Sequence, residues 1–487
     1  MPRSVSSRDD SSARDRRSVQ MLITRAEVEG VAPLAVRLAN RRIEAIGRDL
    51  APLAGEDVLD AAGGALLPGL HDHHLHLSAL AAAMGSVRCG PPQVSGAEQL
   101  ALALRGASGG DWIRGVGYHE SVAGDLDRDR LDALVADRPI RIQHRTGSAW
   151  LLNSRGVERL GLDLELGPPG VERDASGRAT GRLFRLDGWL RERLRDGGWP
   201  SLADVSRRLA SRGVTGLTDA TAGNSGAELR AFVRASDAGE LLQRLVVMGT
   251  PDLPDPAHGS VERGAVKLVL DERELPAMDE LAARIARAHE AGRAAAIHCV
   301  TLAELVLAAG ALRASGAREG DRIEHASVCP PDAAHLLAEL PVAVVTQPGL
   351  VWERGDAYRV DVEPDDRPWL YRLRGLLDAG VPLGAGTDAP FGEPDPWLAM
   401  QAAVDRRTRF GAVLGPDERL SPERALGLFT SSATAPGSRP RRVEPGARAD
   451  LCLLERPWSQ VRCELAQSKV VATFRDGVEI FRATAES

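Results

Sequence analysis

The chain of 487 residues contains no apolar run long enough to cross a membrane. Residues 1–20 are rich in Arg, Ser and Asp and lack the apolar stretch of a secretory signal, so we expect a disordered tail there. Cysteine is also scarce. The five cysteines form no CxxC pair and are odd in number, which argues against a disulfide framework. Together these absences predict a cytoplasmic protein with no membrane partner.

A strong charge of either sign is missing as well. The 61 basic and 68 acidic residues give a formal net charge of -7, and no basic stripe runs along the sequence. Nucleic acid is therefore not expected as a partner, and a small-molecule substrate is expected instead. The sequence specifies no oligomeric state, so a homo-oligomer stays open.

Lysine is the residue type that the sequence lacks most clearly. Only two of the 61 basic residues are lysines, Lys267 and Lys469, and Lys267 lies in the apolar run 264–270. Arginine stays protonated in proteins, whereas a buried lysine loses its proton readily and can then react with carbon dioxide to give an anionic carbamate. Taken alone, Lys267 is explained better by an amphipathic strand that packs the side-chain stem and leaves the amine in water.

Short apolar runs alternate with amphipathic segments of helical length from about residue 213 onward. The expected strands cover residues 65–77, 213–220, 242–249, 265–271, 294–300, 322–326, 342–347 and 382–388. Helical stretches such as 278–291 and 301–315 lie between them. Eight βα units predict an α/β fold in which a (β/α)8 TIM barrel spans residues 67–436.

Two further regions do not fit this repeat. Residues 80–200 are too many for a βα loop, and they predict an inserted subdomain over the barrel mouth after the first strand. Residues 21–66 and 437–487 contain short apolar runs broken by Gly, Pro and Asp. They predict one small β-sandwich domain that is discontinuous in sequence because both chain ends contribute to it.

Metal-ligating side chains fall at the predicted carboxyl ends of several barrel strands. In the segment 72–76 (DHHLH), alternation places His74 and His76 on one face of the first strand. The fifth, sixth and eighth expected strands end near His298, His325 and Asp388. Barrel enzymes place their chemistry at this rim, so these side chains predict a divalent metal site, with zinc favoured by the imidazole ligands.

Lys267 lies towards the end of the fourth expected strand and so joins the same rim. Four histidines and Asp388 can hold two cations, whose mutual repulsion requires an anionic bridge, and a carboxylated Lys267 would supply that bridge. Two metals would lower the pKa of a shared water and polarise a carbonyl, with Asp388 as the acid/base that moves the water's proton to the leaving group. Glu324 is either a partner of one ligand or an outward-facing strand residue in a salt bridge.

The sequence resembles the amidohydrolase superfamily, and most of all amidohydrolase family 3. The resemblance lies in the segments PGLHDHHLH (68–76) and GTDAP (386–390) together with Lys267, His298 and His325. Further similar segments are WIRGVGYHE (112–120), LDALVADRPIRI (131–142), GRATGRL (177–183) and VEPGARADLCLL (443–454). The resemblance implies a TIM barrel with a flanking β domain and hydrolysis of C–N bonds in amides, cyclic amides, formamides or amino-substituted rings. It implies that His74 and His76 bind the first metal, that His298 and His325 bind the second, that Lys267 bridges them, and that Asp388 is the acid/base.

The sequence departs from that family at positions that bear on the substrate. Family 3 usually has a histidine where this chain has Ser148, and often an Ile-Gly-Asp triplet where residues 299–301 read CVT. The substrates of relatives are therefore not transferred to this chain. Four residues are candidates for substrate contact, each with a structural role equally open: Arg145, which could pair with a carboxylate, Ser148, Gln347 and Trp352.

These observations predict a metal-dependent hydrolase that cleaves a C–N bond of a small amide, cyclic amide or formamide. A deaminase of an amino-substituted ring is the first alternative, although deaminases on this scaffold usually bind one metal and lack the bridging lysine. The second alternative is a non-catalytic metal-binding scaffold. That alternative predicts the loss of at least one ligand, and every ligand position is filled here.

Overall fold

The structure is a computed structural model that describes residues 20–108, 111–194 and 199–484. Residues 1–19 of the predicted tail lie outside the described residues. Within the described part of the chain, no helix combines the length and the apolar character that crossing a membrane requires.

Eight parallel strands form the central sheet and follow one another in space in their order along the chain. They are β6 (Leu70–Leu75), β13 (Val214–Asp219), β14 (Arg244–Gly249), β15 (Val261–Val269), β16 (Ala295–Cys299), β17 (Arg322–His325), β18 (Ala343–Thr346) and β19 (Leu383–Ala385). The last strand returns to the first, since the backbone amide of Asp388 donates to the carbonyl oxygen of His74 over 2.8 Å. The predicted TIM barrel is confirmed.

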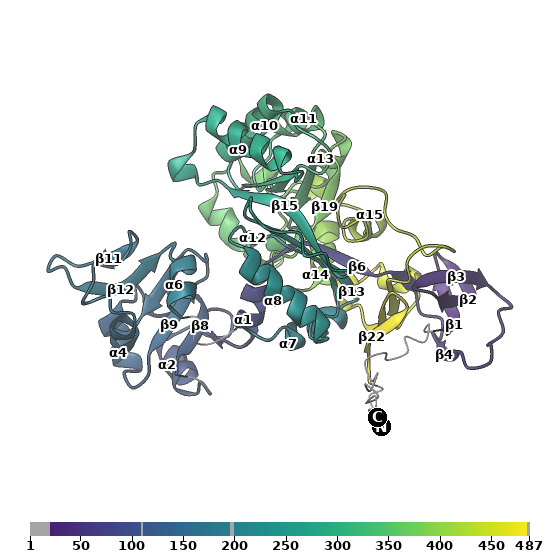
Figure 1. The fold of residues 1–487 in the computed structure, drawn as a ribbon, viewed down its shortest axis with the longest axis horizontal. Helices are drawn as coiled ribbons and strands as arrows, with labels where there is room; N and C mark the ends of the chain where they lie inside the picture. The colour runs from purple at the N-terminus through teal and green to yellow at the C-terminus, as the bar shows by residue number, and fades with distance from the viewer. Residues whose placement is uncertain (1–19, 109–110, 195–198, 485–487) are drawn as a thin grey trace, which may run out of the picture.

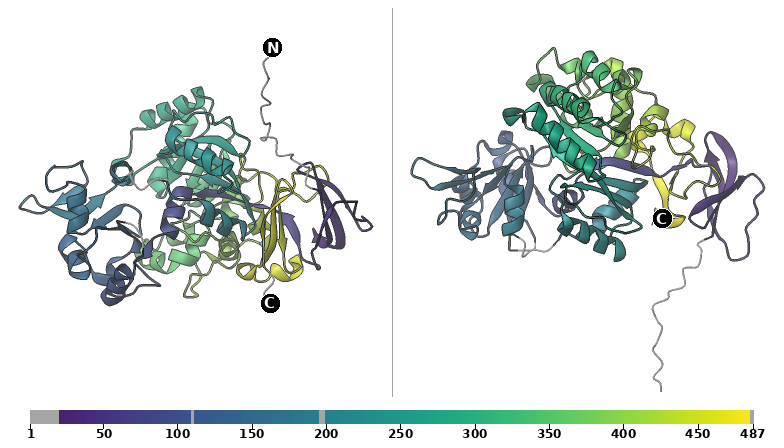
Figure 2. Two further views of the ribbon diagram at one scale, coloured as in Figure 1. Left: turned by 60° about the horizontal axis from the view of Figure 1, so that its bottom comes forward. Right: turned by 45° about the horizontal axis from the view of Figure 1, so that its top comes forward.

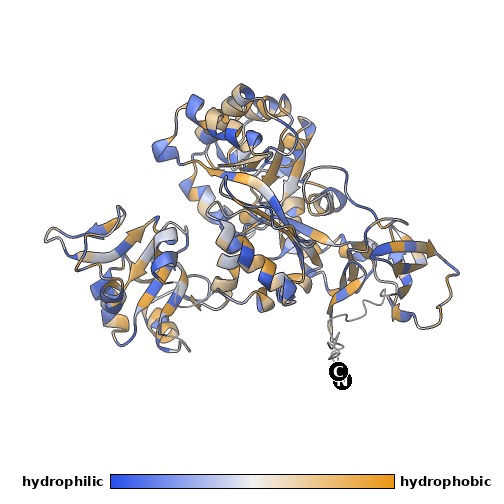
Figure 3. Cartoon of the chain, in the orientation of Figure 1, coloured by the Kyte–Doolittle hydropathy of each residue, from blue (hydrophilic) through white to orange (hydrophobic). Residues whose placement is uncertain are grey.

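Helices surround this sheet (Figure 1). They are α1 (Leu77–Met84), α7 (Ala203–Ala210), α8 (Gly226–Asp237), α9 (Met278–Glu290), α10 (Leu302–Ser315), α11 (Pro331–Ala338), α12 (Gly349–Asp361), α13 (Arg374–Asp378), α14 (Pro396–Asp405) and α15 (Pro422–Gly427), with the short 3-10 helices η2 (Glu272–Glu274), η3 (Arg367–Trp369) and η4 (Pro416–Glu418). The buried residues of α9, Leu281, Ile285 and Ala288, recur at helical spacing, and apolar and polar residues are mixed along the outer helices (Figure 3), as in helices that cover a barrel.

Local sequence sets the bounds of the barrel helices. Ser225 and Glu228 form a capping box at the start of α8, and Thr301 and Glu304 form another at the start of α10. Gly316 ends α10 in the left-handed conformation, which glycine adopts at no steric cost. These signals start α8 and α10 within a few residues of the ends of β13 and β16, so the loops after these two strands are short.

The predicted first strand, residues 65–77, is two strands in the structure. The first, β5 (Leu66–Pro68), pairs with a strand of the small β domain, while β6 pairs with β13 of the barrel. Gly69 lies between them, and a Cβ atom at this position would lie 2.3 Å from the side chain of Thr215. Only glycine fits there. Although Pro68 and Gly69 precede β6, whose residues include three histidines and Asp72, the sequence pattern alone does not show that the chain changes sheets.

The segment between α1 and α7 forms the inserted subdomain. Its elements are β7 (Val87–Arg88), α2 (Ala97–Arg105), β8 (Ile113–Tyr118), α3 (Glu120–Ala123), α4 (Arg128–Leu134), β9 (Ile140–His144), β10 (Ala149–Leu152), α5 (Ser154–Arg159), β11 (Val171–Arg173), β12 (Ala179–Phe184) and α6 (Asp187–Arg193). The strands make one mixed sheet in the order β11-β12-β10-β9-β8-β7. The insert contacts the barrel at the carboxyl ends of the barrel strands. There Arg185 of the insert pairs with Asp271, and Gly147 of the insert packs against Phe391.

Both ends of the chain build the small β domain. One sheet contains β1 (Met21–Val28), β2 (Val31–Ala39), β3 (Arg42–Gly47) and β4 (Asp57–Asp60), and the other contains β5, β20 (Leu451–Leu454), β21 (Val470–Arg475) and β22 (Val478–Arg482), with α16 (Trp458–Val461) and η5 (Leu465–Gln467) beside it. Ile23, Leu451 and Phe474 share one buried core. The insert and this domain lie at opposite ends of the barrel (Figures 1 and 2). The predicted boundaries of the domains, at residues 66, 80, 200 and 436, stay predictions.

Candidate metal centre

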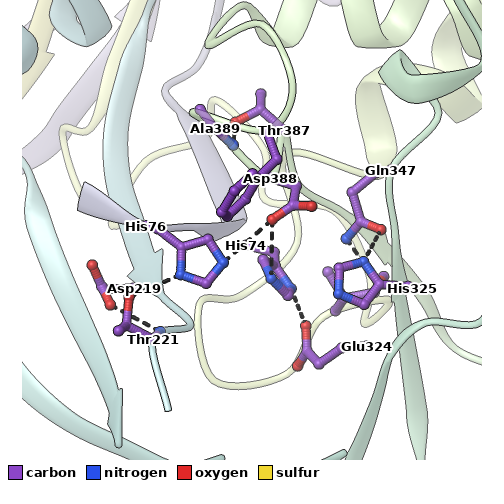
Figure 4. Close-up of polar contacts among 12 residues, drawn as sticks. His74, His76, Asp219, Thr221, Glu324, His325, Gln347, Thr387, Asp388 and Ala389 are labelled. Carbon is purple, nitrogen blue, oxygen red and sulfur yellow. Dashed lines mark hydrogen bonds and ion pairs between the residues drawn. The ribbon is translucent and has the colours of Figure 1, made fainter. Parts of the chain in front are cut away.

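Two imidazoles and one carboxylate meet at the carboxyl end of the barrel (Figure 4). His74 lies on β6, His76 follows that strand, and Asp388 follows β19. The Nε2 atoms of His74 and His76 lie 3.5 and 3.4 Å from Oδ1 of Asp388. Ligand atoms of the three residues all lie within 4.8 Å of one another. Oδ1 of Asp388 is buried and has no hydrogen-bond partner among the described residues. The arrangement fits a divalent cation bound by two imidazoles and a carboxylate.

The second ring nitrogen of three histidines is held by a side chain from a neighbouring strand or loop. His74 Nδ1 bonds to the Glu324 carboxylate, His76 Nδ1 to the Thr221 hydroxyl over 2.8 Å, and His325 Nδ1 to Oε1 of Gln347 over 2.7 Å (Figure 4). A carboxylate or amide oxygen can only accept, so His74 and His325 donate through Nδ1 and keep a lone pair on Nε2. This is the tautomer that an imidazole needs to bind a metal through Nε2.

His298 on β16 and His325 on β17 lie beside the three-residue group. Their ring centroids are 4.5 Å apart, and the ring of His325 is 4.7 Å from that of His74. Burial, and then the charge of Lys267, lowers the pKa of His298 to about 4. Burial is also the largest cause of the low pKa of His325. Both side chains are therefore neutral imidazoles at physiological pH, the form that binds metal ions.

Lys267 points from β15 to the same centre. It is buried, and its Nζ lies 3.7 Å from Oε2 of Glu324. Within the described part of the chain, Nζ has no hydrogen-bond partner. Burial lowers the pKa of the amine to about 8, although the Glu324 carboxylate opposes the shift. A buried amine without a hydrogen bond and with a substantial neutral fraction fits the carbamate expected from the sequence.

Glu324 is buried at the middle of this arrangement and is not an outward-facing strand residue. Its carboxylate accepts hydrogen bonds from His74 and, over 2.5 Å, from Nε of Arg322. Burial acts to raise its pKa, but the charges of Arg322 and Lys267 outweigh burial and hold the pKa well below the usual value. Glu324 is therefore an anion that contacts a metal-ligand candidate on one side and two cations on the other.

Sequence reasoning missed two carboxylates that hold the loops of this centre. Asp72 accepts hydrogen bonds from the backbone amide and the hydroxyl of Thr387, over 3.0 and 2.5 Å, and thereby ties β6 to the loop that carries Asp388. Asp219 accepts from the backbone amide of Thr221 over 3.0 Å and so positions the partner of His76. Each carboxylate ends or adjoins a predicted strand, but its partners become visible only when the strands are in register.

Two residues of the centre have unusual backbone conformations. His325 has a φ of 68° and Asp388 a φ of 56°, both in the left-handed region that non-glycine residues rarely adopt. Such conformations persist where surrounding structure fixes them, and they concentrate at functional sites.

The four predicted substrate contacts lie in three places. Arg145 and Ser148 are exposed in the turn between β9 and β10, which meets the barrel rim through Gly147 and Phe391. The Phe391 ring lies 5.4 Å from that of His76. Gln347 is buried and engaged with His325, and Trp352 on α12 carries the Arg409 guanidinium 4.4 Å from its ring centroid. Contact of these four residues with substrate stays a prediction.

Comparisons with known proteins agree with this geometry. The model of the amidohydrolase family matches residues 57–481. N-substituted formamide deformylase from Arthrobacter pascens is 28% identical over 520 residues, which cover 92% of this chain and 95% of that protein. The putative amidohydrolase YtcJ from Bacillus subtilis (strain 168) is 23% identical over 430 residues, which cover 76% and 79% of the two chains.

Solved structures share the fold. The crystal structure of an uncharacterized metal-dependent hydrolase from Pyrococcus horikoshii OT3 has a TM-score of 0.74 at 21% identity, and the match covers 92% of this chain and 99% of that chain. A second such hydrolase, from Pyrococcus furiosus, has a TM-score of 0.71 at 23% identity, over 90% and 99% of the two chains. With the family match over most of its length, this chain belongs to the amidohydrolase family, a family of metal-dependent hydrolases, and it is a hydrolase that acts on carbon–nitrogen bonds other than peptide bonds.

Proposed function

We propose that this enzyme uses two divalent metal ions, most consistent with zinc, to hydrolyse the C–N bond of a small amide, cyclic amide or formamide. His74 and His76 would hold one ion, His298 and His325 the other, and a carboxylated Lys267 would bridge them. Asp388 would bind metal and act as the acid/base. The similarity to an N-substituted formamide deformylase favours formamides within this substrate class.

One observation carries the proposal: Nε2 of His74 and Nε2 of His76 converge on an oxygen of Asp388 that has no hydrogen-bond partner among the described residues. Burying a carboxylate oxygen without a partner is unfavourable unless a cation or a hydrogen-bond donor contacts that oxygen. Because Nδ1 of His74 donates to Glu324, its Nε2 carries a lone pair towards this oxygen, and a cation bound between the imidazoles and the carboxylate would satisfy both.

Lys267 supports the second ion. Its amine is buried beside the four imidazoles without a hydrogen bond, so a cationic ammonium would repel any metal bound there. Reaction of the neutral amine with carbon dioxide would replace this positive charge by a carboxylate-like group with two ligand oxygens. A negative charge on the Lys267 side chain would reduce the repulsion between two neighbouring cations.

Asp388 has the properties of a proton acceptor. Burial acts to raise its pKa, but His76 and the nearby His74 and His325 outweigh burial and lower it, so the carboxylate is ionised. Bound metal supplies the activation of the attacking water and the polarisation of the scissile carbonyl. The Asp388 carboxylate would take the proton of that water and pass it to the nitrogen that leaves.

The test is hydrolysis of N-phenethylformamide by the zinc-loaded protein, followed by parallel assays for formate, phenethylamine and ammonia. We expect formate and phenethylamine in equal amounts, and loss of turnover in Asp388→Asn. Asp332→Asn is the matched control, because Asp332 is exposed on α11. Ammonia release from amino-substituted rings, with no turnover of any amide or formamide, would favour the deaminase alternative and contradict the proposal.

A further inference from the structure

Arg354 on α12 is a partly buried arginine whose donors are mostly unused. One Nη2 hydrogen bond, over 2.6 Å, goes to the carbonyl oxygen of Phe391. Among the described residues, its guanidinium makes no other hydrogen bond and no ion pair. The carboxylate of the adjacent Glu353 acts on Arg354 through its charge but makes no ion pair with it among the described residues, and its Oε2 accepts from the backbone amide of Glu393 over 3.0 Å. A guanidinium has five N–H donors, so most of them face this part of the molecule without an acceptor.

Other buried arginines of this protein are fully engaged. Arg406 donates to three backbone carbonyls, those of Leu414, Tyr371 and Leu370, over 2.8 to 3.0 Å. Arg372 pairs with Glu418 over 2.7 Å, and Arg322 pairs with Glu324. Burying a cation without hydrogen-bond partners is unfavourable, and the hydrogen bonds of these three arginines reduce that cost. Arg354 is only half-buried, so the donors that it does not use within the protein can reach solvent or a ligand.

Arg354 lies next to the metal centre. Phe391, whose carbonyl it contacts, is three residues after Asp388, and the Phe391 ring packs against that of His76. One turn along the same face of α12, the hydroxyl of Tyr358 lies 3.2 Å from that of Tyr371. Burial raises the pKa of Tyr358 well above its usual value, so the pair is neutral and can donate a hydrogen bond.

The insert carries a second arginine without an ion pair among the described residues, in the turn that contacts Phe391. Arg145 is exposed, and its guanidinium has no ion pair among the described residues. It lies two residues before Gly147, and a Cβ atom at that position would lie 2.5 Å from the Phe391 ring. The helix α12 lies on the side of the barrel that faces the insert (Figure 1). Arg354 and the turn that carries Arg145 therefore meet at one residue of the rim, although their chain segments are far apart in sequence.

We propose that Arg354, with a hydroxyl of the Tyr358–Tyr371 pair and with Arg145 from the insert, forms a subsite for a carboxylate of the substrate. The unused groups are all N–H or O–H donors, so the missing partner is an acceptor, and the planar fork of a guanidinium matches the two oxygens of a carboxylate. The substrate class is an N-acyl or N-formyl compound that carries a carboxylate beyond the scissile bond. This inference rests on the proposed function and selects substrates within it.

The experiment compares two compounds that differ only by the carboxylate, N-formylphenylalanine (both enantiomers) and N-phenethylformamide. For the zinc-loaded enzyme, we expect kcat/KM to be about tenfold to hundredfold higher for the better enantiomer of the carboxylate compound, as for hydrogen bonds to a charged group. Arg354→Met should lower kcat/KM for the carboxylate compound about tenfold or more beyond any fall for N-phenethylformamide, and Arg354→Lys should retain part of the preference. Arg145→Met should reduce the preference without affecting folding, since Arg145 is exposed. Arg359→Met is the control on the exposed face of α12.

Two results would overturn the subsite: equal kcat/KM for both compounds in the unmodified enzyme, or an equal fall for both compounds in folded Arg354→Met. If neither compound is hydrolysed, the proposed formamide hydrolysis fails, but calorimetric titration of the same pair into the zinc-loaded protein still decides the inference. Tighter binding of the carboxylate compound, lost in Arg354→Met, would support the subsite. Equal binding of both compounds would refute it.

Discussion

At the scale of single residues, the two lysines of this chain provide an internal comparison. Lys469 is exposed, whereas Lys267 is buried beside four imidazoles and two carboxylates. An arginine could fill the exposed position equally well, but it could not lose its proton at the buried one. The scarcity of lysine therefore directs attention to a position where burial favours the neutral amine.

Lys267→Ala should abolish bound metal and hydrolysis, because it removes the group that we propose as the bridge. Adding propanoate should restore part of both, since a free carboxylate can occupy the space of the carbamate. Metal content by mass spectrometry and turnover of N-phenethylformamide measure the two effects. Lys469→Ala is the matched control and should behave like the unmodified enzyme. A Lys267→Ala protein that is active and metal-loaded would refute the bridge.

Replacing Glu324 tests a residue that accepts a hydrogen bond from the proposed metal ligand His74. Glu324→Ala leaves His74 without its hydrogen-bond acceptor and leaves Arg322 buried without a counter-charge. We expect the free energy of unfolding to fall by about 3–5 kcal/mol, as for a broken buried ion pair. Zinc affinity should fall by roughly tenfold to hundredfold, as for loss of a partner that orients a ligand.

Denaturant titration and competition with a zinc chelator measure these two changes. Glu324→Gln keeps an acceptor for His74 and should therefore lose less zinc affinity than Glu324→Ala. Glu339→Gln is the control, since Glu339 pairs with Arg313 at the surface, and its effect should stay below about 1 kcal/mol. Unchanged zinc affinity in Glu324→Ala would show that Glu324 does not position His74.

At the scale of strands and helices, the closure of the barrel depends on a close approach of backbone to backbone. A Cβ atom at Gly386 would lie 2.5 Å from the backbone nitrogen of His74. Gly386→Ala should therefore push β19 from β6, with a cost of about 1–3 kcal/mol in unfolding free energy. It should also weaken zinc binding, because the same contact fixes Asp388 against His74 and His76. Gly259→Ala is the control, since no atom lies within 4 Å of a Cβ there. Normal stability and zinc affinity in Gly386→Ala would contradict this account.

The strands of the barrel could be predicted because buried parallel strands are short apolar runs separated by amphipathic helices. The carboxyl ends of those strands suffice to predict that His74, His298, His325 and Asp388 lie on one rim. The partners of these residues could not be predicted in the same way. The bonds from His74 to Glu324 and from His76 to Thr221 join segments more than a hundred residues apart and depend on strand register. The division of residues 65–77 between two sheets was hidden for a related reason, since it depends on which strands β5 and β6 pair with.

At the scale of the whole molecule, the proposed ligands connect the first strand of the barrel to the last. His74 and His76 follow from β6, Asp388 from β19, and the remaining ligands lie on three strands between them. Chelation of the metal should therefore lower the melting temperature of the protein. It removes a ligand that binds only the folded state, and it leaves buried imidazoles, an amine and a carboxylate without their common partner. At a zinc concentration a thousand times the dissociation constant, the metal contributes about 4 kcal/mol to folding.

Scanning calorimetry of the protein before and after chelation, and after zinc is added back, measures this shift. We expect a fall of several degrees that is reversed when about two ions per chain are restored, the number that a carbamate-bridged pair requires. Lys267→Ala provides the control for metal at this centre, because chelation should shift its melting temperature little. An unmodified protein that is metal-free, fully folded and equally stable would contradict the metal centre itself. Saturation at about one ion per chain would instead retain the site of His74, His76 and Asp388 and refute the bridged second ion.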